Sequence, residues 1–234
     1  MDINLVKAFS DNYIWIIEEG TEAVVVDPGE YEGVLSYLEE NQMTLTAIIL
    51  THNHEDHIGG VKEILEKFPN TPVYGPKETE LLADHVVQDG DFFKLLGKNF
   101  QVFKTAGHTK EHISFLMENA LFCGDALFSA GCGRVFTGDY QAQFDALQTF
   151  KSLNEAVEVY AGHEYTQTNL RFAQSIKPSN KKIAQVLDQV NRLNAHDLPT
   201  LPSTIGKEKS INLFLQTETL KDFIDLRKAR DSFQ

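Results

Sequence analysis

Short runs of β-branched and aromatic residues alternate with helical patterns over the first two thirds of the chain. Strands are predicted at residues 23–26, 47–50, 100–103, 120–123 and 157–160, because these runs are apolar and stop at glycine, proline or polar residues. Helices are predicted at 62–68, 76–82 and 141–153. This alternation of strand and helix is typical of an α/β protein.

From about residue 166 onward the pattern becomes helical. Apolar residues at three- and four-residue spacing over 183–193 predict one helix with a single buried face. Pro199 and Pro202 then interrupt the chain. A last helix is expected to begin near Thr219, with Asp222 three residues later as its capping partner and with Leu220, Phe223 and Ile224 buried. We therefore expect two domains, over residues 1–165 and 166–234.

The most distinctive polar segment follows the predicted strand at 47–50. Residues 51–57 read THNHEDH and hold three imidazoles and two carboxylates. Imidazole is the commonest protein ligand for metals, and so many polar rings in one loop are costly to bury unless they bind something. A solvated histidine-rich loop is the alternative, but further isolated ligand candidates follow other predicted strands.

Those further candidates are His108, Asp125 and His163, each beside a glycine near the end of a strand. Sites in α/β proteins gather at the carboxyl ends of strands, so we expect these side chains to share one edge of the sheets. Seven nitrogen and oxygen donors are too many for one zinc ion, so the inventory predicts two metal ions. The expected ligands are His52, His54, Asp56, His57, His108, Asp125 and His163.

Composition restricts the partners of the chain. With 234 residues and a formal net charge of −13, it is too acidic to favour nucleic acid or an anionic membrane. Two cysteines form no disulfide framework, which favours the cytoplasm. The N-terminal residues lack a signal-peptide pattern, and we expect no membrane span. Cys132 is flanked by glycines and has no histidine near it in sequence, so we expect a packing role for it.

The order THxHxDH, His108, Asp125, His163 resembles the metallo-β-lactamase superfamily. Further stretches are similar to its glyoxalase II, or hydroxyacylglutathione hydrolase, family: DNY at 11–13, LFSAGCGR at 127–134, GHEY at 162–165 and RKARD at 227–231. The resemblance covers nearly the whole chain. It implies an αββα sandwich of two mixed sheets, with a helical C-terminal substrate-binding domain.

The resemblance also implies roles for single residues. His52, His54 and His108 would hold one metal, Asp56, His57 and His163 the other, and Asp125 would bridge both. Asp56 would also orient the attacking water, whereas Asp27 and His112 are expected to support the ligands. The residues expected to contact glutathione are Arg134, Tyr165, Arg227 and Arg230.

The chain departs from the family pattern at four positions. Phe136 stands where a tyrosine is frequent, Glu111 replaces a usual glycine, and Leu213 and Gln216 replace a proline and an arginine. These departures concern recognition of the thiol rather than the chemistry.

The implied reaction is hydrolysis of S-(2-hydroxyacyl)glutathione, typically S-D-lactoylglutathione, to glutathione and a 2-hydroxy acid such as D-lactate, the second step of methylglyoxal detoxification. Two divalent ions would act as cofactors; zinc is expected, with iron and manganese left open. A glutathione persulfide dioxygenase and a lactonase or general thioesterase are the alternatives on the same fold. A scaffold without activity is a further one. We expect a monomer whose partner is this small molecule.

Overall fold

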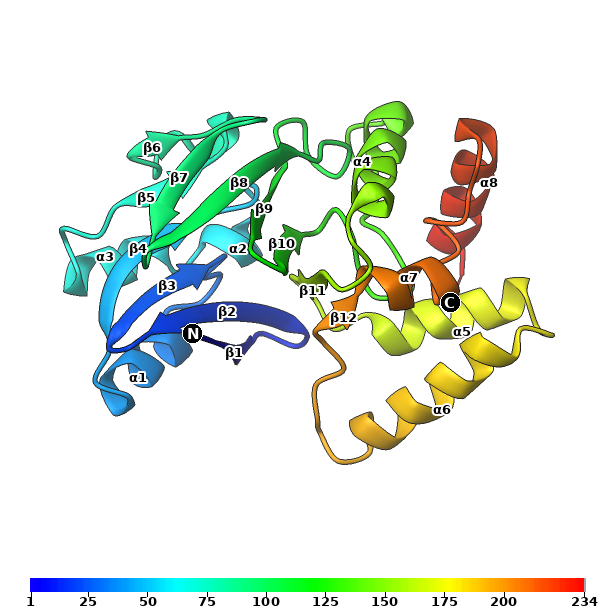
Figure 1. Ribbon diagram of the computed structural model, residues 1–234, viewed down its shortest axis with the longest axis horizontal. Helices are drawn as coiled ribbons and strands as arrows, with labels where there is room; N and C mark the ends of the chain where they lie inside the picture. Colours follow the sequence, from blue (N-terminus) through cyan, green and yellow to red (C-terminus); the bar gives the residue numbers. More distant parts are fainter. Residues whose placement is uncertain (234) are drawn as a thin grey trace.

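Two sheets lie face to face, with helices on their outer sides and a helical group at one end (Figure 1). The computed structural model describes residues 1–233. Each sheet has six strands and is mixed, because it contains both parallel and antiparallel pairs. This αββα sandwich confirms the predicted fold class.

The first sheet has the order β1-β2-β3-β4-β5-β6. Its first three strands form an antiparallel meander, and β3 to β6 run parallel. The parallel strands point their carboxyl ends toward one edge, where the polar loops follow. The strands are β1 (Asp2–Ala8), β2 (Asn12–Glu19), β3 (Glu22–Val26), β4 (Thr44–Ile49), β5 (Val73–Gly75) and β6 (His85–Val86).

The second sheet has the order β12-β11-β10-β9-β8-β7. Only the β10–β11 pair is parallel, so the segments after both of these strands leave the sheet on the same side. The strands are β7 (Phe92–Leu95), β8 (Lys98–Lys104), β9 (Ile113–Met117), β10 (Ala120–Gly124), β11 (Glu158–Ala161) and β12 (Ser203–Thr204).

The main core lies between the two sheets. On β2, Trp15 and Ile17 face this core together with Phe100 and Phe115 of the second sheet. The alternate residue Ile16 faces the opposite way, into a second core under the outer helices. Because both faces of β2 are covered, nearly every residue of this strand is buried and the run reads as continuously apolar.

The helices complete the layers. α1 (Glu32–Glu40), α2 (Glu55–Ile58) and α3 (Val61–Lys67) belong to the first half, and α4 (Tyr140–Ser152) precedes β11. The C-terminal helices stand together at one end of the sandwich (Figure 1). They are α5 (Thr166–Ile176), α6 (Lys181–Asn194), α7 (Ile205–Ile211) and α8 (Leu220–Asp231).

Most predicted elements are present. α8 begins after Thr219, whose side chain accepts a hydrogen bond from the Asp222 N–H, and α6 buries its apolar stripe. The helix predicted at 76–82 is wrong: only the 3-10 turn η1 (Lys77–Thr79) forms, and the chain then turns into β6. The Thr79 hydroxyl donates a hydrogen bond to Pro76 O at 2.9 Å, which stabilises this turn.

The C-terminal part is not purely helical. Ser203 of β12 pairs with Val159 of β11, so residues from this part extend the second sheet. The domain boundary near residue 165 stays a prediction. Among the described residues, no helix is long and apolar enough to cross a membrane.

Candidate metal centre

The seven predicted ligands converge at the edge of the sandwich where β4, β8, β10 and β11 end. His52 and His54 lie in the loop after β4, and Asp56 and His57 lie on the short helix α2. His108 follows β8, Asp125 follows β10, and His163 follows β11. Each ligand is thus positioned by the end of a strand or by the helix that follows it.

The first ligand group consists of His52, His54 and His108. One ligand atom from each lies within 4.8 Å of the others. His108 Nε2 is 3.0 Å from His54 Nδ1, and the buried His52 Nε2 has no hydrogen-bond partner among the described residues. A buried nitrogen without a partner is costly, and a metal ion would satisfy it. The donor set is therefore suited to a divalent cation.

The second ligand group consists of Asp56, His57 and His163. His163 Nε2 lies 3.3 Å from His57 Nε2 and 3.3 Å from Asp56 Oδ2. Two imidazole nitrogens and one carboxylate oxygen that converge in this way are a typical nitrogen and oxygen donor set for zinc, iron or manganese.

Asp125 lies between the two groups. Its Oδ2 is 3.3 Å from His108 Nε2, whereas its Oδ1 is 3.3 Å from His57 Nε2 and 3.4 Å from His163 Nε2. Asp125 Oδ1 is buried and accepts no hydrogen bond from the described residues. Each oxygen of this carboxylate therefore faces a different ligand group.

Asp27 forms a third close group with His52 and His57, but its oxygens are already engaged. Oδ1 accepts a hydrogen bond from the Thr51 N–H at 2.7 Å, and Oδ2 accepts one from the Thr51 hydroxyl at 2.7 Å. Asp27 Oδ2 also lies 3.1 Å from His57 Nδ1. This arrangement fixes the ring of His57 with Nε2 directed at the second group, which is the supporting role expected for Asp27.

The β1–β2 turn and the first residue of β2 supply two further supports that the sequence prediction did not assign. Asp11 Oδ1 lies 2.8 Å from His163 Nδ1, and Asn12 Nδ2 donates to Asp56 Oδ2 at 2.9 Å. Every member of the second group thus has its own supporting residue. The only signal in the sequence was the DNY motif at 11–13, which carried no role by itself.

His112 holds the backbone at Asp125. The backbone N–H of Asp125 donates to His112 Nε2 at 3.2 Å, so this nitrogen is unprotonated and His112 Nδ1 carries the hydrogen directed at Thr105 Oγ1, 2.9 Å away. Burial lowers the pKa of His112 well below its usual value, and the neighbouring His108 lowers it further. His112 is therefore neutral and holds the backbone of Asp125.

The pKa shifts of the candidate ligands follow from burial and from the nearby carboxylates. Burial lowers the pKa of His52 well below its usual value, which keeps the ring neutral as a ligand must be. Burial also lowers the pKa of His57, but the Asp125 and Asp27 carboxylates outweigh it and raise the pKa to about 10. The carboxylates thus favour positive charge at the point where the ligand atoms meet.

Two glycines allow the ligands to approach so closely. A Cβ at Gly162 would lie 2.6 Å from His57 Cε1 and 2.9 Å from Asp125 Oδ1. A Cβ at Gly133 would lie 2.0 Å from the backbone oxygen of Asp125. Neither position has room for a side chain, which explains the glycines beside the ligands.

The ligand groups open into a cavity of about 550 Å³. Phe128, Phe136 and Tyr165 form its aromatic wall, and Tyr165 stacks on His163 with ring centres 4.7 Å apart. Phe128 and Asn169 were not predicted as site residues, because a lone aromatic and a lone amide have no distinctive sequence signal. The cavity is lined by His54, Asp56, His108, Asp125, Phe128, Cys132, Arg134, Phe136, His163, Tyr165, Asn169, Arg227 and Arg230.

All three predicted arginines lie at this cavity, but in different settings. Arg227 is buried and donates to Cys132 O at 2.8 Å, with its guanidinium over the ring of Phe214. Arg230 is partly buried and donates to Asn169 Oδ1 at 3.2 Å. Arg134 is the most exposed, with 57% of its side chain accessible. Arg134 and Arg230 are thus freer than Arg227 to contact a ligand.

This fold and site define a metal-dependent hydrolase of the metallo-β-lactamase superfamily, whose sequence pattern matches residues 9–163. The pattern of the hydroxyacylglutathione hydrolase C-terminus matches residues 164–233. A hydroxyacylglutathione hydrolase of Glaesserella parasuis is 50% identical over the full length of both chains. The chain therefore belongs to the hydroxyacylglutathione hydrolase family.

Solved structures show the same fold. The crystal structure of ETHE1 from Myxococcus xanthus superposes with a TM-score of 0.75 at 25% identity, and the match covers 100% of this chain and 96% of that one. A di-iron-bound form of TTHA1623 matches with a TM-score of 0.59 at 26% identity, over 70% of this chain and 92% of that one. That protein holds two metal ions on this fold.

Proposed function

We propose that this protein hydrolyses the thioester of S-(2-hydroxyacyl)glutathione, typically S-D-lactoylglutathione, to glutathione and a 2-hydroxy acid. One observation carries the proposal: Asp125 turns one oxygen toward each of two ligand groups, in a cavity that three arginines also line. The ligand groups suit a hydrolytic two-metal site, and the arginines suit a peptide that carries carboxylates. Full-length identity of 50% to a hydroxyacylglutathione hydrolase supports the same activity.

The ligand groups indicate what would be bound. His52, His54 and His108 would hold one divalent ion, Asp56, His57 and His163 the other, and Asp125 would contact both. When bound, such ions polarise a carbonyl oxygen and lower the pKa of water to near neutrality. No nucleophile from the protein is then required.

A side chain that lines the cavity would orient the attacking water. Hydrogen bonding to His163 lowers the pKa of Asp56 far below its usual value, and Asn12 holds the same carboxylate at 2.9 Å. Asp56 is therefore ionised at neutral pH and can accept a hydrogen bond from the attacking water, which orients it toward the thioester carbon.

The walls of the cavity would bind the two ends of the substrate. Phe128 and Phe136 offer apolar contact to the acyl and thiol parts. Phe136 also packs its ring edgewise against His54 and His108, with ring centres 5.8 and 5.3 Å away, so it covers the first ligand group instead of offering a hydroxyl. Arg134 and Arg230 would bind the peptide carboxylates by charge-assisted hydrogen bonds.

The bound ions, compartment and assembly belong to the same proposal. We infer two zinc ions, because nitrogen and oxygen donors without a thiolate accept zinc, although iron and manganese also fit. Both cysteines are free and buried, which supports a reducing cytoplasm. The net charge of −13 supports a small-molecule partner rather than nucleic acid or membrane, and a monomer is proposed.

The proposal is tested with one purified, metal-analysed sample and two assays. Release of thiol from S-D-lactoylglutathione under anaerobic conditions is the expected result. Oxygen consumption with glutathione persulfide and no anaerobic hydrolysis would instead identify a dioxygenase. Equal turnover of lactones or of thioesters without glutathione would contradict glutathione specificity, and no turnover of any substrate would contradict catalysis.

A further inference from the structure

Asp231 is the last residue of α8 and lies against the arginines of the cavity. Its Oδ1 accepts a hydrogen bond from Arg227 Nη2 at 2.9 Å and one from Arg134 Nε at 3.3 Å. A carboxylate at the C-terminal end of a helix is disfavoured by the helix dipole, which opposes the small stabilisation from its i,i+4 pair with Arg227. The chain thus keeps a negative charge of its own where a substrate carboxylate would bind.

Arg227 and Arg134 are fixed in position to different degrees. Only 6% of the Arg227 side chain is exposed, and this residue is also fixed by Cys132 O and the ring of Phe214. Arg134 is 57% exposed and makes the longer of the two contacts with Asp231. Arg227 would therefore keep its position without Asp231, whereas Arg134 is free to move to another anion.

The charge of Asp231 acts on all three arginines of the cavity, Arg134, Arg227 and Arg230. Burial lowers the pKa of Arg230, the positive charges of Arg227 and Arg134 lower it further, and Asp231 raises it. One carboxylate therefore offsets part of the repulsion among three guanidinium groups. It also reduces the attraction that these groups exert on any other anion in the cavity.

We propose that Asp231 is an internal competitor for Arg134 and Arg227 that weakens the binding of glutathione and so favours release of the product. The inference rests on the proposed function. Glutathione keeps both carboxylates of the peptide part of the substrate, so the arginines that capture the substrate would also retain the product. Asp231 already contacts Arg134, one of the arginines proposed to capture the substrate, and the neighbouring Arg227, which limits that retention.

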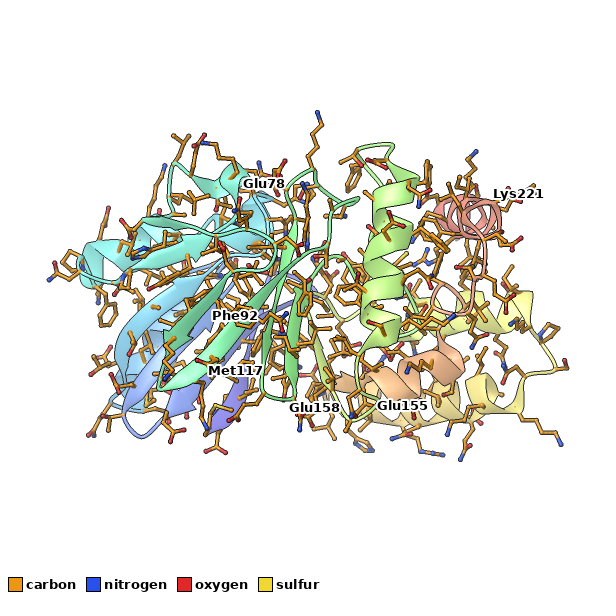
Figure 2. All side chains as sticks on the ribbon, turned by 45° about the horizontal axis from the view of Figure 1, so that its top comes forward. Glu78, Phe92, Met117, Glu155, Glu158 and Lys221 are labelled. Atoms are coloured by element: carbon orange, nitrogen blue, oxygen red, sulfur yellow. The ribbon has the colours of Figure 1, made fainter. Side chains whose placement is uncertain are left out.

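The test compares Asp231→Asn with a matched control. Asparagine keeps an oxygen that can accept from Arg227 but removes the charge. The control is Asp225→Asn, which makes the same charge change on the same helix. Asp225 pairs with Lys221, and the Lys221 side chain points away from the rest of the molecule in Figure 2. The dissociation constant of glutathione is measured by calorimetry on the metal-loaded proteins, together with inhibition of thioester hydrolysis by glutathione.

Asp231→Asn should bind glutathione about two- to fivefold more tightly than the wild type, as expected for loss of one partly exposed competing charge. Asp225→Asn should match the wild type. A purely structural role would loosen binding instead, so weaker or unchanged binding in Asp231→Asn overturns the inference. An equal gain in Asp225→Asn also overturns it, because net charge would then be the cause.

Two further results are distinguishable. If Asp231→Asn fails to fold by circular dichroism, Asp231→Ser takes its place with the same expected direction. If the wild type neither binds glutathione nor cleaves its thioester, the proposed function fails, and this inference fails with it. Wild-type activity combined with unchanged binding in the variants overturns the inference alone.

Discussion

Oδ2 of Asp125 lies 3.3 Å from Nε2 of His108, although the two residues follow different strands of the second sheet. The other oxygen of the same carboxylate faces the second ligand group. Asp125 therefore joins the two sets of three donors into one site, because its carboxylate contacts both sets.

Replacement of Asp125 should therefore disable both halves of the site. Asp125→Ala is expected to lower both metal content and turnover by at least about 10- to 100-fold, the scale seen even when a supporting residue of a metal site is lost. Elemental analysis and thioester hydrolysis measure the two effects. Asp188→Ala, an exposed acidic position on α6, is the control and should behave as the wild type. Retention of one full equivalent of metal in Asp125→Ala would argue against a shared carboxylate.

Arg227 and Arg230 should respond differently to truncation. Arg230→Ala is expected to raise KM for the glutathione thioester, and the corresponding loss of binding free energy is on the order of 1–3 kcal/mol, the strength of a charge-assisted hydrogen bond. The effect on a short thioester without the peptide should be much smaller. Arg227→Ala should in addition lower the midpoint of urea unfolding, because Arg227 is buried and donates to Cys132 O. Equal losses on both thioesters would show that these arginines only hold the C-terminal helix in place.

Glu208 should give the stability of the protein a measurable pH dependence. This carboxyl is fully buried on α7, accepts hydrogen bonds from the Ala130 N–H at 2.7 Å and the Ser129 hydroxyl at 2.8 Å, and also contacts the Ser203 hydroxyl. Burial raises its pKa above the usual 4.5, although these hydrogen bonds oppose the shift. Between the unfolded and the folded pKa, the folded protein binds the extra proton, so stability falls as pH rises through this window.

The comparison with Glu208→Gln isolates this contribution. Glutamine keeps one acceptor and can donate to the Ser129 and Ser203 hydroxyls, so the fold should persist. The free energy of unfolding of the wild type relative to Glu208→Gln should fall as pH rises above about 4.5 and then level off. Urea unfolding at a series of pH values measures the difference, and a difference that grows with pH would refute the assignment.

Cys132 should be dispensable for the chemistry. Burial raises the pKa of its thiol, and its sulfur lies 3.8 Å from Arg227 Nη1 without a histidine to activate it. Cys132→Ala should therefore keep most of kcat, with at most a modest loss of stability from the vacated volume. Mass spectrometry that trapped an acyl group on Cys132 during turnover would contradict this.

The convergence of these side chains could be predicted from the sequence, because His108, Asp125 and His163 each stand beside a glycine after a short strand and residues 52–57 follow β4. A shared sheet edge then follows from the direction of the strands. Asp11 and Glu208 could not be predicted in this way. Asp11 reaches His163, 152 positions further along the chain, and Glu208 looks like a solvent-exposed residue of a short helix until the packing of α7 buries it. Long-range supports of this kind depend on how the elements dock, which no local pattern encodes.

The number of metal ions that full activity requires tests the two-metal site most directly. Metal-free protein is reconstituted with increasing zinc, and bound zinc and hydrolysis of S-D-lactoylglutathione are measured on the same samples. Two ligand groups joined by Asp125 predict that activity rises until about two ions are bound per chain and then stays constant. Full activity with a single tightly bound ion per chain would contradict it.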